Sequence, residues 1–151
     1  MITFSIEPGY DKFWNEAEPL ILDHWAEVGR HNDVLTLNVQ HDVYRYLDAN
    51  DMLDIVIARN EQGDMVGYFF LLLTRHPRDI TKILARDDIT YIKPQYRRGW
   101  AGYKMLKFAL NRAIERGAFV VSFSEKAHRN GYLRRLGFTP AETIYTLVVG
   151  K

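Results

Sequence analysis

Residues 89–102 have the sequence ITYIKPQYRRGWAG, in which a short apolar strand leads into a basic turn and then into a helix. Pro94 ends the strand, because proline has no N–H to donate to a sheet. The first turn of the following helix leaves backbone N–H groups without partners inside the helix, and the helix dipole adds partial positive charge there. We therefore expect this junction to bind an anion such as a phosphate.

The composition indicates one soluble domain. The chain has 151 residues, 47% of them hydrophobic, which is enough for one sizeable core. Its 20 basic and 19 acidic residues leave a formal charge of +1, so no overall field favours nucleic acid or a membrane surface. The absence of cysteine excludes disulfides and thiolate metal sites and favours a reducing compartment. We expect a cytoplasmic protein, because residues 1–7 do not resemble a signal peptide and no apolar run is long enough to span a bilayer.

The N-terminal half predicts a strand, two helices and two further strands. Proline removes a backbone donor, so Pro19 is expected to kink or split the first helix. The turn at residues 60–64 predicts a hairpin, and the strand after it is nearly all apolar, which is typical of the centre of a sheet. The expected elements are residues 2–6 (strand), 13–28 (helix), 42–53 (helix), 53–58 (strand) and 65–74 (strand).

The C-terminal half continues the alternation of strands and helices. A polar loop at residues 75–79 is expected to lead through residues 80–85 into the next strand, and Gly117 is expected to end the helix that begins at Gly102. The order of elements predicts an α/β fold with a mixed sheet. The expected elements are residues 88–92 (strand), 102–116 (helix), 118–123 (buried strand), 127–135 (short helix) and 142–149 (closing strand).

Two stretches carry a resemblance to a known family. Residues 92–106, IKPQYRRGWAGYKML, look like the strand end, pyrophosphate loop and following helix of the GCN5-related N-acetyltransferase superfamily, and in particular of its small phage-encoded members. Residues 130–138, NGYLRRLGF, are similar to the late helix of that family and its turn into the next strand. The resemblance extends over nearly the whole chain in element order, and it implies a three-layer α/β/α fold around a central mixed, splayed β-sheet.

The loop departs from the family pattern of Gln or Arg, two residues, Gly, one residue, then Gly or Ala. With Arg97 first and Gly102 last, the bulky apolar positions match, but Trp100 takes the first glycine position. The register that uses Gly99 and Ala101 instead puts a tyrosine where Gln or Arg belongs, so we prefer the first. A tryptophan turned away from the anion leaves the N–H groups free, whereas one turned inward closes the site. Both orientations are open from the sequence.

The resemblance implies an acetyl-CoA-dependent N-acetyltransferase in which a primary amine attacks the thioester directly in a ternary complex. Acetyl-CoA would lie between two splayed parallel strands, residues 88–92 and 119–123, as co-substrate. The expected acceptor is a small-molecule or protein amine. The sequence leaves open whether the protein forms a homodimer. If the protein is phage-encoded, the compartment is the host cytoplasm. The residues expected to bind the cofactor are Ile92, Lys93, Arg97, Arg98, Gly99, Trp100, Ala101 and Gly102.

Candidate catalytic residues follow from the same resemblance. The family often uses a tyrosine as the acid for the leaving thiolate, but Leu133 stands at that position and Tyr132 lies one residue earlier, about 100° away around a helix. Candidates for the base that takes the amine proton are Asp88, Glu125 and His76.

Other clusters are weaker. The histidines and aspartates of the N-terminal half lack the spacing of a zinc motif, so no metal is expected. Trp14 and Trp25 are core residues or the edge of a substrate cleft. A basic cluster is a solvated face or meets the 3′-phosphate of CoA. It consists of Lys126, His128, Arg129, Arg134 and Arg135.

Two further functions are weighed against catalysis. The substitutions at Trp100 and Leu133 favour a protein that keeps the fold for binding or for a structural role, without acetyl transfer. Nucleic-acid binding is not expected, because the charge is near zero and no known reading motif is present.

Overall fold

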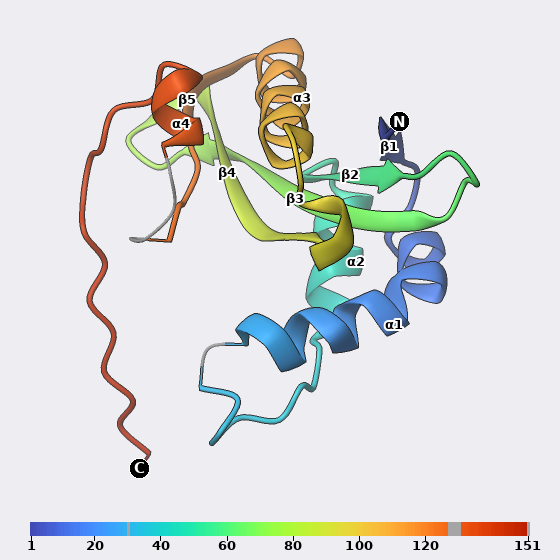
Figure 1. Ribbon diagram of the computed structural model, residues 1–151. Coiled ribbons are helices and arrows are strands. Elements are labelled where there is room, and N and C mark those ends of the chain that lie inside the picture. Colours follow the sequence, from blue (N-terminus) through green and yellow to red (C-terminus); the bar gives the residue numbers. More distant parts are fainter. Residues whose placement is uncertain (30, 127–130, 151) are drawn as a thin grey trace.

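The computed structural model describes residues 1–29, 31–126 and 131–150. Five strands form one sheet in the order β1-β2-β3-β4-β5, and every neighbouring pair is antiparallel except β4 and β5. Helices α1 and α2 lie on one side of the sheet and α3 on the other (Figure 1). This arrangement confirms the three-layer α/β/α fold and the mixed sheet. The elements are β1 (Thr3–Glu7), α1 (Tyr10–Val28), α2 (His41–Ala49), β2 (Leu53–Arg59), β3 (Met65–His76), β4 (Asp79–Ile92), η1 (Pro94–Tyr96), α3 (Ala101–Glu115), β5 (Ala118–Ser122) and α4 (Tyr132–Arg135).

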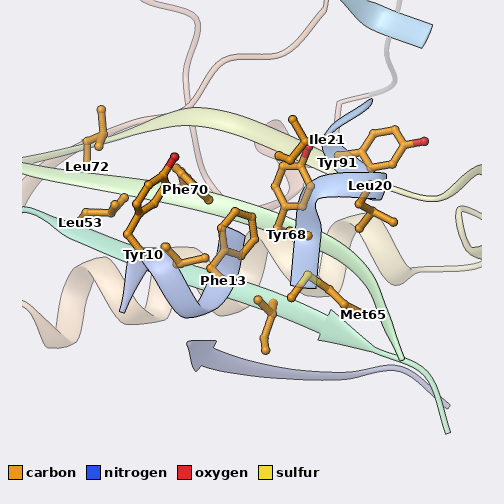
Figure 2. Packing of buried hydrophobic residues seen from close by; sticks show 13 residues of the cluster. Tyr10, Phe13, Leu20, Ile21, Leu53, Met65, Tyr68, Phe70, Leu72 and Tyr91 are labelled. Atoms are coloured by element: carbon orange, nitrogen blue, oxygen red, sulfur yellow. The ribbon is translucent and has the colours of Figure 1, made fainter. Parts of the chain in front are cut away.

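The central strand β3 buries both of its faces, as its apolar sequence predicts. Successive side chains of a strand point to opposite faces, so Tyr68 and Phe70 pack against α1 while Phe69 and Leu71 pack against α3. Figure 2 shows the first of these two cores, in which Phe13 of α1 lies over Tyr68 and Phe70. The sheet thus separates two layers, and a site on one face is screened from the other except where strands part.

Helix α3 approaches the sheet through a stripe that repeats every four residues, made of Ala101, Met105, Ala109 and Ala113. The small alanine side chains let the helix lie close to the strands. Ile114 lies outside this stripe and is 59% exposed.

An ion-pair network ties α3 to β2. The Asp54 carboxylate is only 6% exposed, and it accepts hydrogen bonds from Arg112 Nε at 2.6 Å and Arg116 Nη1 at 2.7 Å. The buried charge is therefore paired on both of its oxygens, as burial requires.

Helix α1 runs without a break through Pro19. The ring lies on the exposed side of the helix, where water can hydrate the carbonyl that the missing N–H leaves unpaired. Helix α2 ends at Ala49, four residues before β2, rather than reaching Leu53. Among the residues that the structure describes, no helix is long and apolar enough to cross a membrane.

The expected loop before the strand at residues 88–92 is wrong. Strands β3 and β4 continue to His76 and from Asp79, so that only Pro77 and Arg78 separate them. The polar residues that suggested a loop lie in a long two-stranded extension, where one antiparallel partner satisfies the backbone and water solvates the side chains.

Strand β5 is an edge strand, and the expectation that it is buried is wrong. Phe119 is 69% exposed, with the Lys82 ammonium 4.5 Å above its ring. A short apolar run looks the same in sequence whether it is central or lateral, because burial depends on which elements cover it.

The expected closing strand at residues 142–149 is also wrong. These residues form no strand, and Figure 1 shows them extending away from α4 and the sheet. Tyr145 is 91% exposed and Leu147 84% exposed. Strand conformation requires a neighbour to accept its hydrogen bonds, and in the described part of the chain no strand pairs with the outer edge of β5. Of the helix expected at residues 127–135, only Tyr132–Arg135 is seen, and residues 127–130 lie outside the described residues.

Candidate functional site

The parallel strands β4 and β5 separate about halfway along β4. They pair from Ile83 with Ala118 to Arg86 with Ser122, and no pairing between them continues beyond that point in the described residues. The Asp87 carboxylate lies where they part, and it accepts hydrogen bonds from the backbone N–H of Ser124 at 3.0 Å and from its hydroxyl at 2.6 Å. At this point the Asp87 side chain, instead of a backbone carbonyl, connects β4 to the segment that follows β5. Burial raises the pKa of Asp87, and the Ser124 hydrogen bonds oppose that rise.

A bulge in β4 follows immediately. Leu71 pairs with Asp87 and Phe69 with Thr90, so two residues of β4, Asp88 and Ile89, lie opposite the single residue Phe70. The extra residue bends the strand and redirects its side chains. As a result, Asp88 and Ile89 both line a cavity on the α1 side of the sheet.

The start of α3 presents unpaired backbone donors. The N–H groups of Arg98, Gly99, Trp100 and Ala101 donate no hydrogen bond to any residue that the structure describes, and the first helical bond runs from Lys104 to the Trp100 carbonyl at 2.8 Å. Gly99 has a φ of 72°, in the left-handed region that glycine tolerates best, and a Cβ there would meet nothing within 4 Å. The junction thus has the unpaired donors that anion binding requires, and anion binding itself stays a prediction.

Trp100 does not lie buried beneath the helix. It is 50% exposed, and its ring contacts those of Tyr103 at 5.4 Å and Tyr132 at 6.2 Å between centroids. The Arg135 guanidinium lies 5.0 Å from the Trp100 ring. These contacts place the indole against Tyr103 and against the side chains of α4.

The Arg97 side chain is engaged with α1. Its guanidinium donates to Glu27 Oε2 at 2.7 Å and to the Ile92 carbonyl at 2.7 Å. The backbone N–H of Lys93 donates a hydrogen bond to the Val66 carbonyl at 2.8 Å, so this N–H is not available to bind an oxygen of a ligand. Arg98, by contrast, is exposed and forms no ion pair with a described residue. The loop therefore has one arginine that anchors it and one that faces solvent.

The cavity on the other face has a volume of about 390 Å³ and lies between α1, the segment before α2 and the sheet. Its walls are mainly aromatic, and they include both tryptophans of α1, Trp14 and Trp25. Asp88 is the one charged residue among the described residues that line it. Its Oδ2 accepts a hydrogen bond from the Tyr44 hydroxyl at 2.7 Å. Burial, with Asp88 adding to it, raises the pKa of Tyr44.

His24 is a further polar residue in the cavity wall. Its Nδ1 lies 2.6 Å from the Tyr68 hydroxyl, and its ring stacks on Tyr91 at 4.7 Å. Burial lowers the pKa of His24 to about 4, an effect opposed by Glu27 and reinforced by Lys126 and Arg97. Burial therefore keeps His24 neutral at pH 7, and its Nδ1 shares a hydrogen bond with the Tyr68 hydroxyl.

The candidate bases are not brought together. Asp88 lies in the cavity wall, whereas His76 lies at the tip of the β3–β4 hairpin, roughly 30 Å along the strand at about 3.3 Å per residue. Glu125 is exposed in the segment after β5. Tyr132 is the first residue of α4 and packs against the start of α3, with its ring 3.5 Å from the position that a Gly102 Cβ would take. Leu133 is buried.

Other expectations concern metals and the basic cluster. In the described ranges, no group of three His, Asp or Glu side chains is placed to hold a metal. Lys126, Arg134 and Arg135 are exposed, and His128 and Arg129 of the basic cluster lie outside the described residues.

The sequence did not identify three residues that shape the site, namely Asp87, Tyr44 and His24. Each acts through a partner that is distant in the chain, such as Tyr44 with Asp88 or His24 with Tyr68. One signal was available for Asp87, because an acidic pair inside a strand is uncommon. No local signal marked the other two.

Several solved structures with the same fold are acetyltransferases. Glucosamine-6-phosphate N-acetyltransferase from Arabidopsis thaliana superposes with a TM-score of 0.72 at 11% identity, over 97% of this chain and 99% of that one. A predicted acetyltransferase from Clostridium acetobutylicum with acetyl-CoA gives 0.67 at 15% identity, over 99% and 97%. Ribosomal-protein-alanine N-acetyltransferase from Brucella melitensis biovar Abortus 2308 gives 0.65 at 14% identity, over 99% and 98%.

No protein-family model matches the chain, and no curated protein matches it in sequence. The chain has the fold of the GCN5-related N-acetyltransferases. The names of the neighbours cover both a sugar phosphate and a ribosomal protein, so the fold does not specify an acceptor.

Proposed function

We propose that this chain, which has an acetyltransferase fold, moves the acetyl group of acetyl-CoA to a primary amine. One observation carries the proposal: β4 and β5 part directly after Arg86 and Ser122, in a sheet flanked by a helix start with unpaired donors. The proposal places the thioester where these strands are no longer paired, next to Asp88 in the wall of the cavity on the α1 side. The neighbour with acetyl-CoA supports this use of the fold.

The residues present fit a pyrophosphate. The N–H groups from Gly99 to Gly102 lie at the positive end of the α3 dipole and have no described partner outside the helix. Arg98 adds a charge that no described carboxylate neutralises. Arg97 serves to fix the loop to α1 through Glu27 instead of contacting the anion directly.

The proposed reaction forms a carbon–nitrogen bond, breaks a carbon–sulfur bond and moves one proton from nitrogen to sulfur. The amine nitrogen bonds to the acetyl carbonyl carbon, the carbon–sulfur bond breaks, and a proton leaves the nitrogen while the sulfur gains one. We assign the first proton transfer to Asp88, because it is the carboxylate in the cavity wall next to the strand separation. We assign the second to Tyr132, whose hydroxyl has no hydrogen bond to a described residue and whose ring faces Gly102.

The test is thermal unfolding with and without acetyl-CoA. A ligand at about 100 times its dissociation constant stabilises the native state by about 2.7 kcal/mol. For a chain of this length, that corresponds to a rise in Tm of roughly 5–10 °C. Arg98→Ala should weaken binding roughly tenfold through the lost charge-assisted contact. Arg78→Ala, at the distant hairpin tip, is the matched control and should bind as the parent does.

A second function is kept because Leu133, at the position of the family tyrosine, is buried and unable to donate a proton. In that case the fold binds a ligand without acetyl transfer. Absence of any Tm shift at millimolar acetyl-CoA would reject the transferase and favour this alternative. A shift without acetyl transfer to any amine would favour it as well.

A further inference from the structure

We propose that the cavity between α1 and the sheet binds a small primary monoamine with an apolar, preferably aromatic, body, and that the ammonium pairs with Asp88. The proposal rests on the proposed function in one respect, since the bound amine would be the acetyl acceptor. Binding itself needs no cofactor and is tested separately.

The interior of the cavity presents ring faces and few free polar atoms. Each tyrosine in its wall uses its hydroxyl within the protein. Tyr44 binds Asp88, Tyr68 binds His24 and Tyr10 binds His41 Nδ1 at 2.9 Å. The phenols therefore have partners already, and a ligand meets mainly the apolar surfaces of Tyr, Trp and Phe rings. A ligand that fills such a site needs an apolar body.

The charge of the cavity calls for one cation. No lysine or arginine is among the described lining residues, and His24 is neutral at pH 7. Asp88 Oδ2 is held by Tyr44, whereas Oδ1 accepts no hydrogen bond from a described residue. A fixed carboxylate with one free oxygen, beside aromatic faces, favours an ammonium both by direct pairing and by cation–π attraction.

The volume and the charges of the described lining residues together disfavour other amines. A volume of about 390 Å³ lies near the lower end of the range of about 300–1,000 Å³ for small-molecule sites, so it suits one small body. A phosphorylated aminosugar would bury its phosphate without a cationic partner. A polyamine would bury a second ammonium without a second carboxylate.

The position of Asp88 links the cavity to the separation of the strands. Asp87 occupies the point where β4 and β5 part, and Asp88 is the next residue, turned toward the cavity by the bulge opposite Phe70. An ammonium on Asp88 therefore lies at the end of the cavity that is nearest to the opening between the strands.

The experiment uses 2-phenylethylamine as the probe, with the full-length chain and no acetyl-CoA. Trp14 and Trp25 line the cavity, and in a Trp100→Phe background they supply the whole indole fluorescence. We expect saturable quenching by 2-phenylethylamine and at least tenfold weaker binding of 2-phenylethanol, which has the ring without the charge. Spermidine and glucosamine 6-phosphate should produce no saturable change.

Asp88→Asn keeps the shape and removes the charge. It should reduce the affinity for 2-phenylethylamine at least tenfold and leave the affinity for 2-phenylethanol unchanged. The control is Asp23→Asn, at an exposed position of α1, which should change neither affinity. Equal binding of the two probes, or an Asp88→Asn variant that binds the amine as the parent does, would overturn the proposal. An unchanged affinity for 2-phenylethanol shows that the Asp88→Asn variant is folded, so a loss of amine binding then reports the lost charge.

The two proposals fail in different ways. Amine binding without a Tm response to acetyl-CoA supports the amine site and rejects the transferase. A Tm response to acetyl-CoA with no amine binding supports the cofactor site and overturns the amine site.

Discussion

His24 should make the stability of this protein depend on pH between about 6.5 and 4. Burial lowers the pKa of the folded imidazole from 6.5 to about 4. In that interval the unfolded chain binds a proton that the folded chain does not, so stability falls as the pH falls and is independent of this group above pH 6.5. Because the shift is about 2.5, the loss approaches about 3.4 kcal/mol well below pH 4.

The loss at an accessible pH is smaller. Between pH 7.5 and pH 5, linkage with these two pKa values gives a loss of about 2 kcal/mol. The ring is partly exposed, and Glu27, Lys126 and Arg97 also act on it, so solvent screening reduces the expected loss to about 1–1.5 kcal/mol.

The assay is urea unfolding at pH 7.5, 6 and 5 for the parent and for His24→Gln. Glutamine keeps an acceptor for the Tyr68 hydroxyl but does not titrate. Carboxylates titrate in both proteins, so the difference between the two pH profiles isolates His24. The parent should lose about 1–1.5 kcal/mol more than the variant between pH 7.5 and pH 5. Parallel profiles would refute the argument that burial keeps His24 neutral.

Two further changes test the fold. Asp54→Ala should lower the free energy of unfolding by about 1–3 kcal/mol, because it leaves the guanidinium groups of Arg112 and Arg116 without their buried partner. Asp51→Asn, which affects only an exposed carboxylate, should cost less than about 0.5 kcal/mol in the same urea titration, and equal losses would contradict the network. Removal of residues 142–151 should change the Tm by less than about 2 °C by circular dichroism, because the exposed side chains of residues 142–147 bury little. A large fall would mean that the segment packs on the sheet.

Much of the fold was predictable because periodicity reports burial directly. The apolar run of β3 predicted a central strand, and alternation along residues 2–6 predicted the half-buried β1. Pro94 and Gly117 marked the ends of β4 and α3 through their backbone chemistry. These signals are local, so they survive without knowledge of the neighbours.

The wrong predictions for residues 118–123 and 142–149 have the same cause. Residues 118–123 and 142–149 have strand-like sequences, but the first is an exposed edge and the second has no strand partner among the described residues. Strand-like composition states what a segment is able to do, whereas pairing depends on which other strand arrives beside it.

The candidate site divides in the same way. The sequence by itself predicted the turn at Gly99 and the helix start with unpaired N–H groups, because both follow from local backbone geometry. Only the tertiary structure decided that Arg97 anchors to Glu27, that His76 lies far from the junction, and that Asp88 faces an aromatic cavity. Those outcomes depend on side chains separated by tens of residues, and no local pattern encodes such distances.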